Sequence, residues 1–137
     1  MNPLNDIALV LLTRALAVAE VRGGRTGAGG PIPETVYVEI DDARGRSEAV
    51  AAGANTERFM PGFYIVFYDN FTGSDPAAEK ERLRRIFWAY RTALYAERTL
   101  GGRVDDILLT EWDADLVKRG NEYYWYWALT VQCEMEA

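Results

Sequence analysis

Residues 60–69 read Met-Pro-Gly-Phe-Tyr-Ile-Val-Phe-Tyr-Asp, and this stretch decides the fold class. Within it, positions 63, 65 and 67 are Phe, Ile and Phe, while positions 64, 66 and 68 are Tyr, Val and Tyr. Successive side chains of a strand point to opposite faces of the sheet, so both faces of this strand carry apolar groups. The pattern predicts a central strand that is covered on each side.

Downstream of that strand, the sequence predicts one long helix and two further strands. Asp75 is a suitable N-cap and Pro76 a suitable first helical residue, and the helix is expected to continue to about Thr99, before a Gly-Gly pair. Strands are predicted over residues 104–112 and 123–135 and are expected to pair antiparallel. The last strand alternates strongly, which places Cys133 on its core side as a buried, inert thiol.

Upstream, the elements are shorter and are separated by polar or glycine-rich sequence. A helix is predicted over residues 4–21, followed by a stretch rich in glycine that is interpreted as a flexible connection over residues 22–33. The alternation in Val36–Ile40 predicts a strand. Residues 41–58 are small and polar, which predicts a long loop or a loose hairpin.

These elements predict a single domain over residues 1–137, with flexible segments at 22–33 and 41–58. Their order is helix, strand, strand, helix, strand, strand. We expect an α+β fold: a two-layer sandwich in which a four-stranded, mostly antiparallel sheet carries both helices on one face (α-β-β-α-β-β).

The composition excludes several classes of function. The formal net charge is -6, which disfavours a free-standing binder of duplex nucleic acid. Histidine is absent and Cys133 is the only cysteine, so Cys/His zinc sites, internal disulfides and Ser-His-Asp triads are not available. The apolar run at residues 7–12 is too short to span a bilayer and lacks the flanks of a secretory signal, so no membrane contact and a cytoplasmic location are expected.

One face of the predicted sheet is unusually aromatic. The face that the helices leave open is expected to carry Thr130, Gln132 and five tyrosines: Tyr37, Tyr64, Tyr68, Tyr124 and Tyr126. A contiguous aromatic patch of this kind is seldom left in water. We expect either a neighbouring chain or the segment over residues 41–58 to cover it, which points to assembly.

The long helix carries two stripes. Leu83, Ile86, Phe87, Tyr90 and Leu94 recur at helical spacing and predict the core face. A second row consists of cationic and aromatic residues: Lys80, Arg84, Trp88, Arg91, Tyr95 and Arg98. This row is either a solvated basic face or a recognition face, because Arg and Trp are enriched at interface hot spots.

The charges of the chain are also divided between segments. Residues 74–100 hold six basic and four acidic residues, whereas residues 104–137 hold two basic and eight acidic ones. Opposite charges on two surfaces of one small domain suit head-to-tail self-association, which can close into a ring. Pairing of the same groups within one chain would give the same sequence pattern.

Catalytic interpretations have less support. Adjacent carboxylates at 105–106 and 113–115 lack further ligands at useful spacing, so no metal site, no catalytic residue and no cofactor is predicted. The alternative function is a small cone-shaped ligand-binding or isomerase-like domain, similar to the nuclear-transport-factor-2 superfamily. Its general base would be Asp69 or Glu111, held in apolar surroundings.

Almost the whole chain resembles the tail terminator (tail completion) proteins of long-tailed bacteriophages and phage-like particles. The resemblance lies in a short first helix, a Gly/Pro link into Pro33-Glu34-Thr35-Val36-Tyr37-Val38-Glu39-Ile40, and a strand at Gly62-Phe63-Tyr64-Ile65-Val66-Phe67. It continues in the long helix, in Leu100-Gly101-Gly102-Arg103-Val104-Asp105 before Ile107-Leu108-Leu109-Thr110, and in the aromatic last strand.

The resemblance implies a structural virion protein and no enzyme activity. Such proteins form a ring, commonly of six subunits, that caps the tail tube, stops its polymerisation and presents a surface to the head or neck. The implied partners are copies of the chain itself, the tail tube protein and a head or neck connector, while DNA passes through the lumen without specific binding. A different neck adaptor is a further alternative.

The same resemblance gives the segment over residues 41–58 a role. We expect it to be a mobile docking loop that projects toward the tube or a neighbouring subunit. Its candidate contact residues are the charged ones: Asp41, Asp42, Arg44, Arg46, Glu48 and Arg58. The implied location is the head-proximal end of the tail, after assembly in the host cytoplasm.

Overall fold

The aromatic stretch at residues 60–69 forms the inner part of β3 (Glu57–Asn70), the central strand of the sheet. A computed structural model, which describes residues 2–49 and 57–136, places β3 between β2 (Tyr37–Ala49) and β5 (Glu122–Glu136), antiparallel to both. Phe63, Ile65 and Phe67 are buried, as predicted for this strand.

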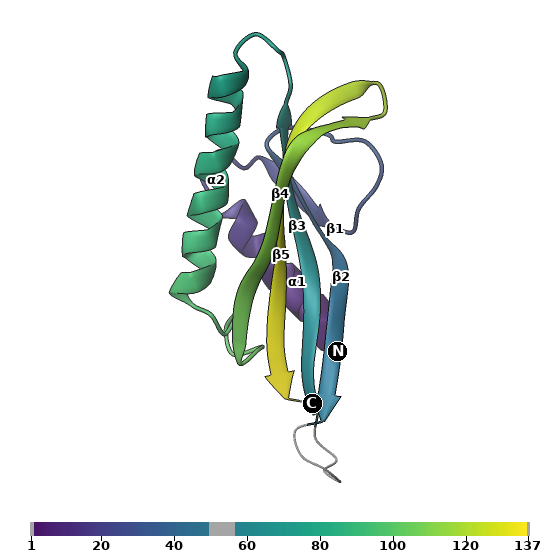
Figure 1. The fold of residues 1–137 in the computed structure, drawn as a ribbon, viewed down its shortest axis with the longest axis vertical. Helices are drawn as coiled ribbons and strands as arrows, with labels where there is room; N and C mark the ends of the chain where they lie inside the picture. The colour runs from purple at the N-terminus through teal and green to yellow at the C-terminus, as the bar shows by residue number, and fades with distance from the viewer. Residues whose placement is uncertain (1, 50–56, 137) are drawn as a thin grey trace.

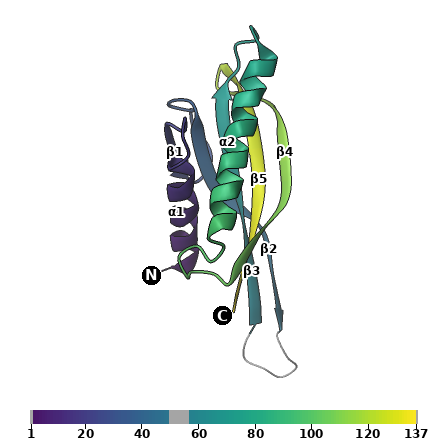
Figure 2. The ribbon, with the colours of Figure 1, turned by 90° about the vertical axis from the view of Figure 1, so that its left-hand side faces the viewer.

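The sheet is open and has five strands in the order β1-β2-β3-β5-β4. β4 (Asp106–Arg119) pairs antiparallel with β5, whereas β1 (Gly23–Thr26) pairs parallel with β2. Helices α1 (Pro3–Leu16) and α2 (Pro76–Ala96) pack on the same face of the sheet (Figures 1 and 2). The predicted α+β class is therefore confirmed.

Both helices begin where the sequence places a cap and a proline. The side chain of Asn2 accepts from the backbone N–H of Leu4, and that of Asp75 accepts from Ala78 N–H at 3.1 Å. These bonds satisfy backbone donors that have no partner within the helix. None of the helices in the described residues is long and apolar enough to cross a membrane.

The main core lies between the helices and the sheet. Four of the five residues of the predicted α2 stripe are buried, and Phe87 is partly buried against them. Tyr90 is fully buried, and its hydroxyl donates to the backbone carbonyl of Leu11 at 2.9 Å, which ties α2 to α1. Cys133 is buried in the same core, and burial raises the pKa of its thiol to about 12. An inert thiol follows, because the thiolate is the reactive form.

The prediction of four strands is wrong, because β1 lies inside the glycine-rich segment over residues 22–33. A Cβ atom on Gly24 would lie 2.5 Å from the Cγ1 atom of Val38 and 2.8 Å from a methyl group of Leu12. Glycine at this position therefore allows the backbone of β1 to approach both β2 and α1. The glycine content of residues 22–33 had instead predicted a flexible connection.

Of the two alternatives predicted for residues 41–58, a long loop or a loose hairpin, the described residues form a hairpin, whose strands are more regular than predicted. β2 continues to Ala49 and β3 begins at Glu57, and the two strands pair beyond a bulge between Ala43 and Arg46. Figure 1 shows this hairpin running past the lower ends of the helices. Because no helix covers it there, its side chains are mostly exposed and it has no apolar alternation that could reveal a strand.

The boundaries of the other helices and strands differ less from the predicted ones. α1 ends at Leu16 rather than near residue 21. The strand predicted over residues 104–112 is longer in the structure, because β4 continues to Arg119 and turns into β5 at Gly120 and Asn121.

Candidate interaction surfaces

The sequence predicts two surfaces for partners: the open sheet face and the outer row of α2. The structure brings three of the five predicted tyrosines together in one cluster on the open face. Tyr37, Tyr68 and Tyr124 are each less than 10% exposed and pack around Ile32, which is also buried.

The cover over these tyrosines comes from the chain itself. Ile32 belongs to the segment over residues 27–33, which we call the strap; it crosses the open face at the tyrosine cluster. The expectation that a neighbouring chain or residues 41–58 cover these tyrosines is therefore wrong. A single isoleucine between two prolines was too weak a signal to predict this contact.

A buried charge network lies beside the tyrosine cluster. Glu39 is 1% exposed, and its carboxylate accepts from Arg25 Nε at 2.9 Å and from Arg119 Nη1 at 3.2 Å. Burial alone would raise the pKa of Glu39, but the hydrogen bonds from the two arginines outweigh burial and lower it. Arg119 also donates to the Tyr68 hydroxyl at 3.0 Å, and burial together with the charge of Glu39 raises the pKa of Tyr68 to about 12.

The same two arginines hold the strap. Arg25 donates to the carbonyl of Gly29, and Arg119 donates to the carbonyl of Gly30 at 2.6 Å. Buried charges are stable only when they are paired and hydrogen-bonded, and here the strap completes the set of partners. These residues were not among the predicted site residues, although a Glu between apolar positions of a predicted strand was a visible signal.

The other two predicted tyrosines lie outside the cluster centre. Tyr64 is 44% exposed, and it lines a polar hollow of about 500 Å³ together with Arg44, Arg46 and Glu111. Tyr126 packs at the margin of the cluster and donates from its hydroxyl to Asp113 at 2.9 Å. The open face is thus covered at its β1 end and exposed around Tyr64.

The upper and middle parts of the α2 row form stacked cation–aromatic contacts. The ammonium group of Lys80 lies 4.8 Å from the ring centre of Trp125. The guanidinium group of Arg91 lies between two rings of its own helix, 4.9 Å from Trp88 and 4.8 Å from Tyr95. Trp88 is nevertheless 60% exposed, so the stack presents an aromatic surface to solvent.

The residues at the C-terminal end of the α2 row form contacts within the chain. Arg98 donates from Nε to Asp106 at 2.6 Å and from Nη2 to the carbonyl of Ile107 at 2.8 Å. The Tyr95 hydroxyl accepts from the backbone N–H of Leu109 at 2.9 Å. These contacts attach α2 to the start of β4. In contrast, Arg84 and Arg91 form no ion pair with the residues that the structure describes.

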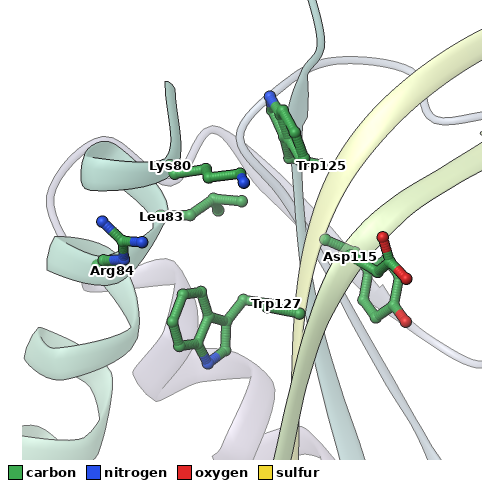
Figure 3. A pocket seen from close by; sticks show the side chains of 8 residues that line it. Lys80, Leu83, Arg84, Asp115, Trp125 and Trp127 are labelled. Carbon is green, nitrogen blue, oxygen red and sulfur yellow. The ribbon is translucent and has the colours of Figure 1, made fainter. Parts of the chain in front are cut away.

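A groove of about 240 Å³ lies between α2 and the β4–β5 pair. Figure 3 shows Lys80, Leu83 and Arg84 of α2 facing Trp125 and Trp127 of β5, with Asp115 beyond the strands. The indole nitrogens of both tryptophans are buried and have no hydrogen-bond acceptor within the described residues. The groove therefore combines an apolar floor with a cationic rim.

The six charged residues predicted for a docking loop are distributed along the hairpin. Five of them lie on β2, and Arg58 lies on β3, where it pairs with Glu134 at 3.2 Å and with Glu48 at 3.8 Å. The rest of the predicted loop, residues 50–56, lies outside the described residues.

The geometry of the carboxylates disfavours the isomerase-like interpretation. Asp69 is 1% exposed, but both of its oxygens accept from Arg82, with Nε at 2.6 Å from Oδ2, while Glu111 is exposed. Neither is a free carboxylate in apolar surroundings. In the described part of the chain, no group of three or more Cys, Asp or Glu side chains is arranged to hold a metal ion. In comparisons with known proteins, the chain matches no protein-family model and no curated protein.

Proposed function

We propose that this chain is the subunit of a ring that caps the tail tube of a bacteriophage or a phage-like particle. In this role the ring stops tube polymerisation and presents its other side to a head or neck connector. The protein acts by surface complementarity and not as an enzyme. It resides at the head-proximal end of the tail.

One observation carries the proposal: the two arginines in the middle of the α2 row form no ion pair with the described residues. Arg84, Trp88 and Arg91 present two cations and an exposed ring, whereas most other arginines of the structure are paired. Exposed Trp and Arg side chains are typical of the centre of a protein interface. A partner with carboxylates would complete this surface, and a second copy of this acidic chain can provide them.

The hairpin and the charge of the chain support the same role. The β2–β3 hairpin extends beyond the helices and exposes arginine and carboxylate side chains, so it can reach a neighbouring protein without disturbing the core (Figure 1). The formal net charge of -6 would repel phosphate, which suits a conduit through which DNA slides.

The proposal is tested by reversing the charge of the α2 row. The variant Arg84→Glu/Arg91→Glu is expected to convert the ring to monomers, because like charges would face the acidic partner surface. Native mass spectrometry and light scattering measure the mass. Negative-stain images of the unmodified protein should show rings.

A matched control reverses two exposed arginines elsewhere. The variant Arg85→Glu/Arg103→Glu changes the net charge equally but leaves the α2 row and the hairpin intact, so its ring should persist. A wild-type protein that stays monomeric at high concentration would contradict the proposed function. Equal masses for the two double variants would reject the α2 row as the interface.

A further inference from the structure

The sheet ends in two open edges that lie on opposite sides of the molecule. β1, covered by α1, forms one edge, and β4 forms the other (Figure 2). β4 is 14 residues long, and residues 110–115 within it are exposed at every position. Such an edge can accept another strand, and natural proteins seldom leave a long one uncovered.

The surface beside β4 is apolar as well as open. α2 packs on β3 and β5, so the groove remains over the helix side of β4. Trp112 of β4 is 68% exposed, and its ring centre lies 6.4 Å from that of Phe87 on α2. Exposed aromatic side chains next to an open edge indicate an interface.

The two edges have complementary charge. The exposed part of β4 reads Glu111-Trp112-Asp113-Ala114-Asp115, with three carboxylates and no base. The stretch that includes β1 reads Arg22-Gly23-Gly24-Arg25-Thr26, with no acid; Arg22 is exposed, while Arg25 is partly exposed and paired with Glu39. Pairing between two β4 edges would instead bring like charges together, which is destabilising.

The directions of the strands fit the same pairing. β1 is parallel to β2, and three antiparallel pairings separate β2 from β4, so β4 runs antiparallel to β1. A rotation about an axis along the strands therefore brings β4 of one copy beside β1 of the next in antiparallel orientation. The helices stay on one face, and the next copy's α1 approaches the groove with its exposed Leu9 and Leu16.

From these observations we propose that β4 of one subunit pairs with β1 of the next, so that the sheet continues through the assembly. The inference rests on the proposed ring and names the contact that closes it. Because the two edges differ, the contact is heterologous, as a ring requires. The apolar groove is then covered by α1 of the neighbouring subunit.

The pairing is tested by cross-linking introduced cysteines. Thr26 and Ala114 both lie on the helix side of their strands, opposite Ile40 and Trp127, so Thr26→Cys/Ala114→Cys places one thiol on each edge. Placing the second cysteine at Trp112 or Leu116 instead samples the two adjacent registers. Mild oxidation of at least one of the three pairs should give a ladder of covalent oligomers up to the full ring.

Single-cysteine variants are the controls, because each can form covalent dimers at most. If the wild-type protein is a ring but all three pairs yield no species above the dimer, the strand pairing is overturned while the proposed function stands. If the wild-type protein forms no ring, both the pairing and the proposed function are rejected.

Discussion

The open face of the sheet and the surface formed by α2 and β4 differ in how their polar and aromatic residues are paired. On the open face, Glu39, Arg25 and Arg119 satisfy each other and the strap covers the tyrosines. On α2 and β4, Arg84 and Arg91 form no ion pair with the described residues, and Trp88 and Trp112 are more than half exposed. The first arrangement stabilises the monomer, whereas the second is suited to a contact with another chain.

The largest effect on the unfolding free energy is expected at the buried charge network on the open face. Glu39→Ala removes the carboxylate that both arginines share and leaves two partly buried cations without a partner. Breaking a buried ion pair in this way costs about 3–5 kcal/mol of unfolding free energy. Urea unfolding followed by tryptophan fluorescence measures the change.

The control for this variant is Glu81→Ala, an exposed residue of α2. Its unfolding free energy should change by no more than about 0.5 kcal/mol. Equal losses in the two variants would show that the network on the open face does not stabilise the fold.

A smaller change in the unfolding free energy is expected when the pH is lowered. Because the pKa of Glu39 is lower in the folded state than in the unfolded chain, its ionisation stabilises the fold above the unfolded pKa of about 4.5. That contribution is lost as the pH falls through the folded value. The difference in unfolding free energy between the wild-type protein and Glu39→Gln should therefore be largest near neutral pH.

Chemical denaturation of both proteins between pH 7 and pH 3 checks this expectation. The gap between them should narrow as the pH drops below 4.5, because protonation makes the wild-type side chain neutral, like that of the variant. A gap that stays constant or widens in acid would contradict the role of the carboxylate charge.

The smallest effect on the unfolding free energy is expected in the α2 row. Trp88→Ala removes a ring that is 60% exposed, so the unfolding free energy of the monomer should change by about 0.5 kcal/mol or less. Self-association should nevertheless weaken by about thirtyfold, since a hot-spot tryptophan contributes 2 kcal/mol or more. Sedimentation over a concentration series measures the self-association of the variant and of the wild type.

Tyr123→Ala is the matched control, because Tyr123 is 50% exposed but lies outside the α2 row. Its association should equal that of the wild type. If both aromatic variants associate normally, the row is only a solvated face.

The parts of the fold that could be predicted are those specified by local sequence. The alternation around Ile65 gave the central strand, and Asp75 with Pro76 gave the start of α2. β1 could not be predicted, because the requirement for Gly24 comes from Leu12 and Val38, which are distant in sequence. The distal hairpin could be predicted only as an alternative to a loop, because strands without a buried face carry no apolar period.

The candidate surfaces were predicted less completely. The composition of the α2 row was visible in the sequence. The sequence did not show that Arg98 pairs with Asp106, whereas Arg84 and Arg91 form no ion pair with the residues that the structure describes. The tyrosines were placed on the correct face of the sheet. Their cover depends on Ile32 and on two arginines whose positions only the folded chain defines.

The buried thiol of Cys133 has a practical consequence for following assembly. With a pKa of about 12 and no exposure, this only cysteine should remain unmodified by maleimide dyes at neutral pH. A single cysteine introduced on the surface would then carry the only fluorophore. Energy transfer between donor- and acceptor-labelled subunits could report subunit exchange in real time, in otherwise native protein.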